Sequence, residues 1–391
     1  MRPTLVFDSE VYPNWTLFLF RDVETGVQEG FEHPMNLPRL REIMRTSRLV
    51  TFNGLGYDIP LLMLALKGAT AAQLKHASDR IIIQHCKPWN FKKEFNVVLD
   101  PPELDHIDLM EVAPLTGSLK AYAGRLHAYS LQDLPIEPST HVSPEQIEIL
   151  RQYCANDLLS TEKLYTALKK PIELREQMSK TYGIDLRSKS DAQIAEAVIK
   201  IEVEKLIGPI GKPSPEQIVG NRFHYVTPDW VRFRSLPILE LVEEAEFVVA
   251  DTGKVILPPA LSKKDIIVGG MPYRMGIGGL HSKEQSRSIE ADATHLLIDF
   301  DVRGYYPEGI VRQGLFPPNM GPAFITVFRK LVDERIAAKL TGRVSDAASL
   351  KVVTLSCFGK MGSKWSYLYH PPLVVQVTVT GQLILLMLME A

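Results

Sequence analysis

Short strands and longer helices alternate along the first 170 residues, as the spacing of apolar positions predicts. Residues 3–8 and 15–20 have the apolar-rich pattern of two strands joined by a hairpin. Residues 49–52 form a further buried strand that runs into a glycine-containing turn, and Asp58 then begins an apolar helix. Strands mixed with helices in this way predict an α/β domain.

The most clearly bounded helix is predicted over residues 143–168. Ser143 is a capping residue, Pro144 occupies the first helical position, and Gln146 completes a capping box with Ser143. Another helical stretch is expected from 191 to 206.

The second half of the chain begins with a region rich in proline and glycine, residues 207–295, which is typical of a connecting region. The short apolar run at 296–301 predicts a strand. Two helices are expected after it, at about 323–340 and 345–358.

Residues 373–391 are strongly apolar. A membrane anchor is one interpretation, but Gln376, Thr378, Thr380 and Gln382 interrupt the run, and a span needs ~18 uninterrupted apolar residues. We therefore expect a strand followed by a buried helix. A helix without a C-terminal cap also predicts that the domain continues beyond this chain, and that its leucines need a partner surface.

Composition adds only broad limits. The chain has 391 residues, 45% hydrophobic and 23% charged, which is typical of a globular protein with room for two or three domains. Its formal net charge is −2, so any nucleic-acid surface must be local. Three widely separated cysteines form no disulfide framework and predict a reducing, cytoplasmic setting. The N-terminal apolar run predicts a strand and not a signal peptide.

Acidic residues recur in three separated segments. Asp8 and Glu10 alternate along a strand, so both side chains lie on one face. Asp58 stands at a helix start, and Tyr153 and Asp157 lie four residues apart on one face of the long predicted helix. Converging carboxylates repel each other unless cations lie among them, so this pattern indicates a metal-dependent phosphodiesterase site.

The order Asp-x-Glu, Asn-(x)3-Tyr-Asp, Tyr-(x)3-Asp resembles the exonuclease motifs of the DEDD family of 3′–5′ exonucleases, in the subclass with a catalytic tyrosine. The resemblance implies a ribonuclease H-like fold and two Mg²⁺ or Mn²⁺ ions, one activating the attacking water and one steadying the leaving oxygen. It implies metal ligands at Asp8, Glu10, Asp58 and Asp157. It also implies that Tyr153 orients the water.

Other possible ligands are weaker. His85, Cys86 and His106 lack the paired spacing of a zinc site. Asp108 ends a predicted strand, and a simple strand-end carboxylate is the favoured interpretation over a residue at the fringe of the cleft.

Residues 301–310 resemble motif A of family B DNA polymerases, Asp-x-x-Ser-Leu-Tyr-Pro-Ser-Ile-Ile. The resemblance implies that Asp301 bridges both catalytic metals, with Val302 as a further metal position. It also implies that Tyr306 closes on the sugar of the incoming nucleotide. Glu308 departs from the motif and adds a charge near the site.

Residues 351–359 resemble motif B of the same family, with Lys351, Ser356 and Gly359 at matching positions and Leu355 in place of Asn. The resemblance implies a nucleotide contact by Lys351 and DNA contacts by Ser356 and Gly359.

Arg335 and Lys339 lie four residues apart on the preceding helix, where the family grips the triphosphate. The alternative is a solvated helix face shared with Asp333 and Glu334. Residues 301–364 contain ten Lys or Arg against five Asp or Glu, a local charge of +5.

Gly278 and Gly279 resemble the glycine pair that contacts the template strand in family B polymerases, although a plain turn is the simpler alternative. The family's motif C, Tyr-x-Asp-Thr-Asp, is missing, because no aspartate follows Gly359. The resemblance therefore implies a palm that a C-terminal part must complete. The implied division is 1–206 exonuclease domain, 207–298 connecting region, 299–325 palm, 326–359 fingers and 360–391 truncated palm.

The sequence thus predicts the N-terminal part of a phage-type family B DNA polymerase with a proofreading exonuclease, in the cytoplasm and without a membrane. Its expected partners are DNA, deoxynucleoside triphosphates and a polypeptide that carries motif C. The alternatives are a stand-alone DEDD exonuclease and a DNA-binding subunit of a split polymerase.

Overall fold

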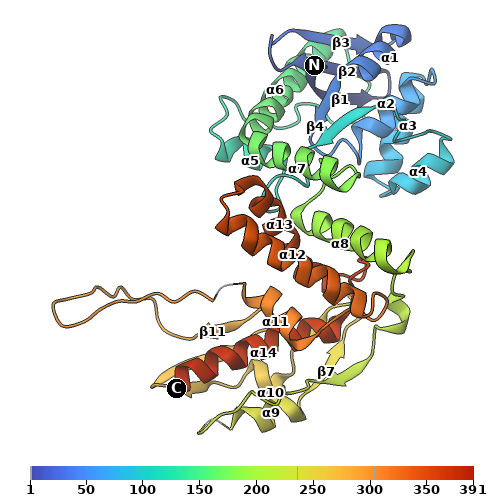
Figure 1. Ribbon diagram of the computed structural model, residues 1–391. Coiled ribbons are helices and arrows are strands. Elements are labelled where there is room, and N and C mark those ends of the chain that lie inside the picture. Colours follow the sequence, from blue (N-terminus) through green and yellow to red (C-terminus); the bar gives the residue numbers. More distant parts are fainter. Residues whose placement is uncertain (1, 236, 303) are drawn as a thin grey trace. The chain divides into compact units, whose positions relative to one another are not determined.

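The computed structural model describes residues 2–235, 237–302 and 304–391. The chain forms two compact units, one ending at Ser190 and one beginning at Asp191 (Figure 1). The first unit ends before the expected boundary at 206, because helix α8 (Asp191–Ile207) packs against helices α12 and α13 of the second unit.

The first unit is built on a mixed five-stranded sheet in the order β3-β2-β1-β4-β5. Its strands are β1 (Thr4–Tyr12), β2 (Trp15–Asp22), β3 (Gln28–Glu32), β4 (Arg48–Thr51) and β5 (Asp105–Asp108). The first three pair antiparallel, and β1, β4 and β5 pair parallel. The predicted hairpin is confirmed, since Tyr12 pairs with Trp15 at its tip.

Helices cover both faces of this sheet, and the alternation along β1 decides which residues face which layer. Phe7 and Val11 pack with the apolar residues of one layer: α1 (Leu37–Thr46), α2 (Asp58–Ala65), α3 (Ala71–Ile82) and α4 (Pro88–Glu94). Val6 and Tyr12 pack with those of the other layer: α5 (Leu119–Arg125), α6 (Pro144–Ala167) and α7 (Lys169–Tyr182). The expectation of a mixed α/β architecture is confirmed.

Helix α6 begins where the sequence predicts. The Ser143 hydroxyl accepts from the Gln146 N–H, and the Gln146 side chain accepts from the Ser143 N–H. Pro144 has no N–H of its own, so it adds no unpaired donor to the first turn.

The second unit contains two antiparallel sheets of three strands, ordered β6-β7-β8 and β11-β10-β9. Its elements after α8 are η1 (Pro215–Gln217), β6 (Arg222–His224), α9 (Ile238–Glu244), β7 (Glu246–Val249), β8 (Val255–Ile256), α10 (Pro259–Ser262), β9 (Ile266–Val268), β10 (Met271–Met275), β11 (Leu280–Ser282), α11 (Tyr305–Gln313), α12 (Pro322–Leu340), α13 (Val344–Met361) and α14 (Pro371–Glu390). The predicted helices near 323–340 and 345–358 are confirmed as α12 and α13.

The predicted strand at 296–301 is wrong. These residues are extended and irregular within a long excursion between β11 and α11 (Figure 1). Leu296 is 87% and Phe300 82% exposed. A strand needs a neighbouring strand to satisfy its backbone groups, and no strand pairs with this segment in the part of the chain described here.

The predicted strand after 373 is also wrong, since residues 371–390 form the single helix α14. Its polar residues fit that helix. The Thr378 hydroxyl donates to the Val374 carbonyl, and the Gln382 amide donates to the Thr378 and Gly276 carbonyls. A helix satisfies its own backbone and needs no neighbouring edge.

Most apolar side chains of helix α14 are already buried within the second unit. The expectation that its leucines need a partner surface is therefore wrong for most of the helix. Val375, Val379, Leu383 and Leu386 are buried with residues 225–275 of the same unit. Leu388, at 64% exposed, lies outside this core. By length and composition α14 could cross a membrane, but core helices of globular proteins meet the same test.

Candidate active site

Strand β1 presents two acidic residues toward helix α6. Asp8 and Glu10 lie on the same face of β1 as Val6 and Tyr12, which is the face that packs on α6. One carboxylate oxygen of Asp8, one of Glu10 and the Cys154 sulfur all lie within 4.8 Å of one another.

Asp58 reaches the same group as the first residue of α2. It is buried, and its Oδ1 accepts a 2.6 Å hydrogen bond from the Ser9 hydroxyl. Ser9 lies between Asp8 and Glu10 and points to the opposite face of β1. Through this bond the strand holds Asp58 close enough for its charge to act on the carboxyl groups of Asp8 and Glu10.

Helix α6 supplies Tyr153 and Asp157, one turn apart. Burial raises the pKa of the Asp157 carboxyl, and hydrogen bonding with Tyr153 and the charge of Lys120 partly oppose this. The Lys120 ammonium lies 5.8 Å from the centre of the Tyr153 ring. Burial also raises the pKa of Tyr153, so its hydroxyl stays protonated.

The charges of neighbouring carboxyl groups add to burial in raising the pKa values of Asp8 and Glu10. Burial, then the charges of Asp58, Glu10 and Asp157, hold the pKa of Asp8 well above its ordinary value. Burial, then Asp157 and Asp58, raise the pKa of Glu10 to about 8. Burial, together with the charge of Asp108, raises the pKa of Asp58 to about 7, although the Ser9 hydrogen bond opposes the change.

These residues suit divalent cations. Glu10 is 8% exposed, and in the described part of the chain its carboxylate has no hydrogen-bond or ion-pair partner. A buried carboxylate without a partner is costly, and hard cations such as Mg²⁺ or Mn²⁺ prefer oxygen ligands of this kind. Asp8, Glu10, Asp58 and Asp157 could supply them.

His106 is not part of this group. It is buried on β5, where its Nε2 lies 2.8 Å from the Thr51 hydroxyl. Burial and the nearby Arg187 lower the pKa of His106 to about 3, so the ring is neutral.

In the second unit, three of the segments singled out from the sequence meet at Tyr306. Its ring stacks on Phe358 of α13 with centroids 4.8 Å apart, and its hydroxyl donates to the Gly278 carbonyl at 2.9 Å. Tyr305 stacks on Tyr306 and donates to the Gly381 carbonyl. The tyrosine pair thus joins α11, α13, α14 and the 276–279 turn. Gly279 lies in that turn, where its carbonyl accepts from the Gly276 N–H.

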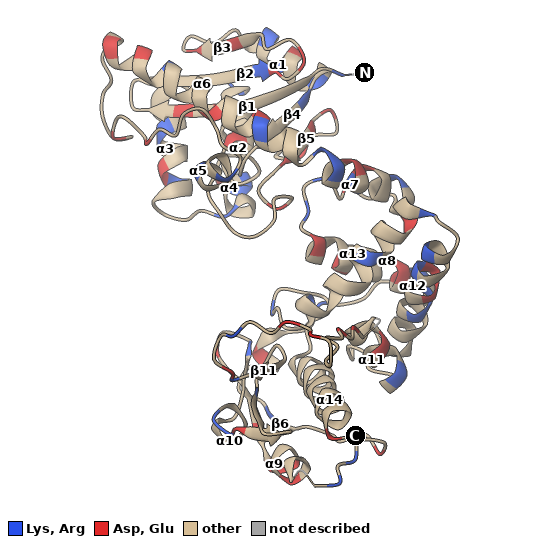
Figure 2. Cartoon of the chain, turned by 90° about the vertical axis from the view of Figure 1, so that its left-hand side faces the viewer, with Lys and Arg blue, Asp and Glu red and all other residues tan. Residues whose placement is uncertain are grey.

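The predicted triphosphate-binding residues lie on the paired helices α12 and α13. Arg335 contacts the Thr354 hydroxyl at 3.4 Å across the pair. Lys339 and Lys351 each lie about one turn from this contact, and both are exposed. Charged residues of both signs run along α12 (Figure 2), where Lys330 pairs with Glu334.

Ser356 and Gly359 lie on α13, near Phe358 in sequence. Asp301 and Val302 lie apart from any regular element, because the strand expected to carry them does not form. Asp301 is exposed and makes no hydrogen bond or ion pair with the described residues.

Three residues with clear roles in the site were missed or undervalued from the sequence. Ser9 binds Asp58, Cys154 joins Asp8 and Glu10, and Asp108 accepts three backbone hydrogen bonds. The position of Ser9 between two candidate ligands was a usable signal. The contacts of Cys154 and Asp108 depend on segments far away in the chain, so no local pattern marks them.

Comparison with known proteins found no matching family model and no significantly similar curated protein.

Proposed function

We propose that the first unit is a metal-dependent 3′–5′ exonuclease that hydrolyses phosphodiester bonds in single-stranded DNA. The observation that carries this proposal is the burial of Glu10 beside Asp8 and Asp58, with no Lys, Arg or His among the described residues paired with its carboxylate. Such an arrangement destabilises the fold unless a bound cation offsets the repulsion.

Each residue has a distinct task in the proposed reaction. Asp8, Glu10, Asp58 and Asp157 would hold two divalent cations, which activate a water molecule and stabilise the leaving oxygen. Ser9 holds one carboxylate oxygen of Asp58 through its hydrogen bond. The protonated Tyr153 hydroxyl is hydrogen-bonded with the Asp157 carboxyl, and from there it can orient the attacking water.

The sheet supports a ribonuclease H-like fold for this unit. Its order is β3-β2-β1-β4-β5, and only β2 runs against the other strands. The metal-binding positions lie on the central strand β1, on the helix that follows β4, and on α6. The motif resemblance implies the same placement.

The test is digestion of 5′-labelled single-stranded DNA by the purified chain. We expect stepwise shortening from the 3′ end in Mg²⁺ or Mn²⁺, and none in EDTA. Asp8→Ala and Asp157→Ala should each abolish it, whereas Glu24→Gln, at an exposed turn, should have no effect. Undiminished digestion by the Asp8→Ala, Asp157→Ala double variant in EDTA would refute the assignment.

For the second unit we propose a partial palm and fingers of a family B DNA polymerase. The stacking of Tyr306 on Phe358 supports this assignment, as do the exposed Lys339 and Lys351, each about one turn from the Arg335–Thr354 contact. Because no aspartate follows Gly359, nucleotidyl transfer would require motif C from a further polypeptide. Without that polypeptide, the chain should act as an exonuclease or as a DNA-binding subunit.

Primer extension distinguishes these possibilities. The chain alone should bind a primer-template and incorporate no nucleotide, because two-metal transfer needs carboxylates from more than one segment. Extension by the chain alone that Asp301→Ala abolishes would show that the palm is already complete. Extension only after addition of a candidate C-terminal polypeptide would favour a split polymerase over a stand-alone exonuclease.

A further inference from the structure

Asp108, the last residue of β5, uses its carboxylate to bind the turn that precedes Asp58. Its Oδ1 accepts from the Asn53 N–H at 2.8 Å and from the Met110 N–H at 3.0 Å. Its Oδ2 accepts from the Leu55 N–H at 2.9 Å. The side chain is buried, so water cannot easily replace these bonds.

The turn at 53–56 depends on such support. Asn53 has a φ of +65°, a conformation that side-chain-bearing residues adopt rarely. Gly54 leaves no room for a side chain, since an added Cβ would lie 2.0 Å from the Thr51 hydroxyl oxygen. The Gly54 carbonyl then accepts from the Ile59 N–H at 2.9 Å, which connects the turn to the first residues of α2.

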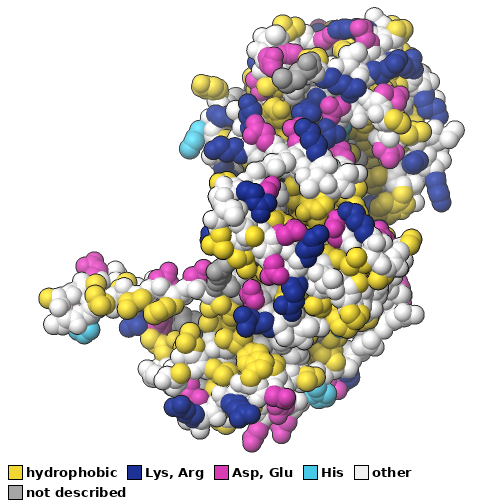
Figure 3. All heavy atoms as spheres, in the orientation of Figure 1, with side chains coloured by type: hydrophobic (Ala, Val, Ile, Leu, Met, Phe, Trp, Pro, Cys, Tyr) yellow, Lys and Arg dark blue, Asp and Glu magenta, His cyan; other side chains and the backbone are white. Residues whose placement is uncertain are grey.

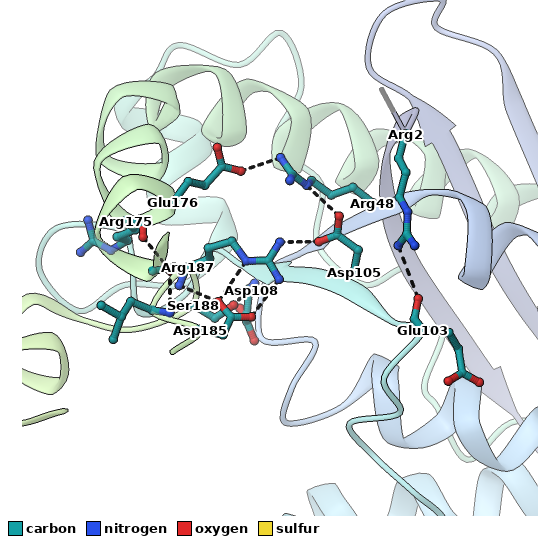
Figure 4. Close-up of polar contacts among 12 residues, drawn as sticks. Arg2, Arg48, Glu103, Asp105, Asp108, Arg175, Glu176, Asp185, Arg187 and Ser188 are labelled. Carbon is teal, nitrogen blue, oxygen red and sulfur yellow. Dashed lines mark hydrogen bonds and ion pairs between the residues drawn. The ribbon is translucent and has the colours of Figure 1, made fainter. Parts of the chain in front are cut away.

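Two anchors hold the position of Asp108 itself. Parallel pairing places Asp108 beside Thr51, the last residue of β4 before the turn. The Asp108 N–H donates to the Ser188 hydroxyl at 2.9 Å. Figure 4 shows Ser188 beside Asp108, with the neighbouring Arg187 in contact with Asp105 at the start of the same strand.

The start of β5 belongs to a separate ion-pair network. Asp105 pairs with Arg187 and with Arg48, and Arg48 also pairs with Glu176 of α7 at 2.6 Å (Figure 4). This network braces the strand but makes no contact with the 53–56 turn in the described residues. A substitution in this network therefore serves as a control: it weakens the hold on β5 without removing a hydrogen bond to the turn.

We propose that Asp108 is a positioning residue: through the 53–56 turn it fixes the Asp58 carboxylate for cation binding. This inference rests on the proposed exonuclease, although it makes a claim about cation binding that is independent of DNA hydrolysis. Ser9 holds the Asp58 side chain from β1, and Asp108 holds the turn before Asp58 from β5, so both strands position this candidate ligand.

The decisive variant is Asp108→Asn, which keeps the size of the side chain. One oxygen is replaced by an NH₂ group, which cannot accept from a backbone N–H, so at least one amide of the turn loses its partner. The matched control is Asp105→Asn, on the same strand, which removes ion pairs and leaves the turn bonded.

Three measurements on the full chain separate positioning from general destabilisation. Mn²⁺ binding is followed by electron paramagnetic resonance, hydrogen–deuterium exchange reports on residues 53–58, and nuclease rate is measured against Mn²⁺ concentration. In Asp108→Asn we expect Mn²⁺ affinity to fall about 10- to 100-fold, with faster exchange in the turn. Activity should recover substantially at high Mn²⁺, because the ligands themselves remain.

The outcomes are distinguishable. Loss of Mn²⁺ affinity in Asp105→Asn equal to that in Asp108→Asn, at equal loss of thermal stability, would overturn the inference, as would unchanged Mn²⁺ affinity in a folded Asp108→Asn. If the wild-type chain binds Mn²⁺ but digests no DNA, the proposed function fails. The binding and exchange data would still test the role of Asp108.

Discussion

Replacing Glu10 by glutamine should stabilise the cation-free protein at alkaline pH and have little effect at acidic pH. Burial and the neighbouring Asp157 and Asp58 raise the pKa of Glu10 from its ordinary 4.5 to about 8 in the folded state. A carboxyl group with a raised folded pKa favours folding below its unfolded pKa, and this contribution is lost as the pH rises through the folded pKa. The window for Glu10 therefore runs from about pH 4.5 to about pH 8.

The size of the effect follows from these two pKa values. Each pKa unit corresponds to about 1.4 kcal/mol, so full titration across the window represents on the order of 5 kcal/mol. Between pH 5.5 and pH 8.0 the wild-type protein should lose on the order of 3 kcal/mol through this group alone. Glutamine does not titrate, and the variant should escape that loss. For a unit of this size, 3 kcal/mol corresponds to a difference of about 6–12 °C in melting temperature.

The assay is thermal unfolding in EDTA at both pH values, with hydrogen–deuterium exchange of β1 peptides to identify the unit that responds. The control is Glu24→Gln, since Glu24 is exposed at the turn after β2. Added Mg²⁺ at pH 8.0 should raise the melting temperature of the wild type more than that of Glu10→Gln, because the variant lacks one candidate ligand.

A single result would refute this reasoning. If wild type and Glu10→Gln lose the same stability between pH 5.5 and pH 8.0, Glu10 is not held among repelling carboxylates, and the basis of the cation site disappears.

Further predictions concern the turn, the catalytic tyrosine and the core of the second unit. Tyr153→Phe should retain more nuclease activity in the DNA digestion assay than an alanine at any candidate metal ligand, because the hydroxyl orients water and holds no cation. Gly54→Ala should lower thermal stability by about 1–3 kcal/mol, since its Cβ would overlap the Thr51 side chain, and equal stability to wild type would contradict the packing described. Leu383→Ala should cost about 2–5 kcal/mol in urea unfolding, whereas Leu388→Ala, on the exposed side of α14, should cost little.

Local features of the first unit were predictable because their causes are local. Capping by Ser143 and Gln146 set the start of α6, and side-chain alternation placed Asp8 and Glu10 on one face of β1. Spacing of one helical turn placed Tyr153 beside Asp157. Each of these conclusions needs only a few consecutive residues and the period of the element.

The second unit shows where local patterns fail. Residues 296–301 have the composition of a strand but form none. Their hydrophobic side chains are exposed in a projecting segment (Figure 3). Residues 373–380 are rich in β-branched Val and Thr, and they nevertheless form a helix. β-propensity acts through packing and pairing with a neighbouring strand, so it decides little where no neighbour is present.

The residues that carry the candidate chemistry could be named from the chain alone, since the acidic motifs and their spacing belong to it. The folded protein was needed to show that Ser9 binds Asp58, that Cys154 lies with Asp8 and Glu10, and that Asp108 holds the turn before Asp58. The difference lies in the range of the contacts. Capping and alternation act within a few residues, whereas these contacts join β1, α2, β5 and α6, which meet only after the sheet has formed and helices have covered both of its faces.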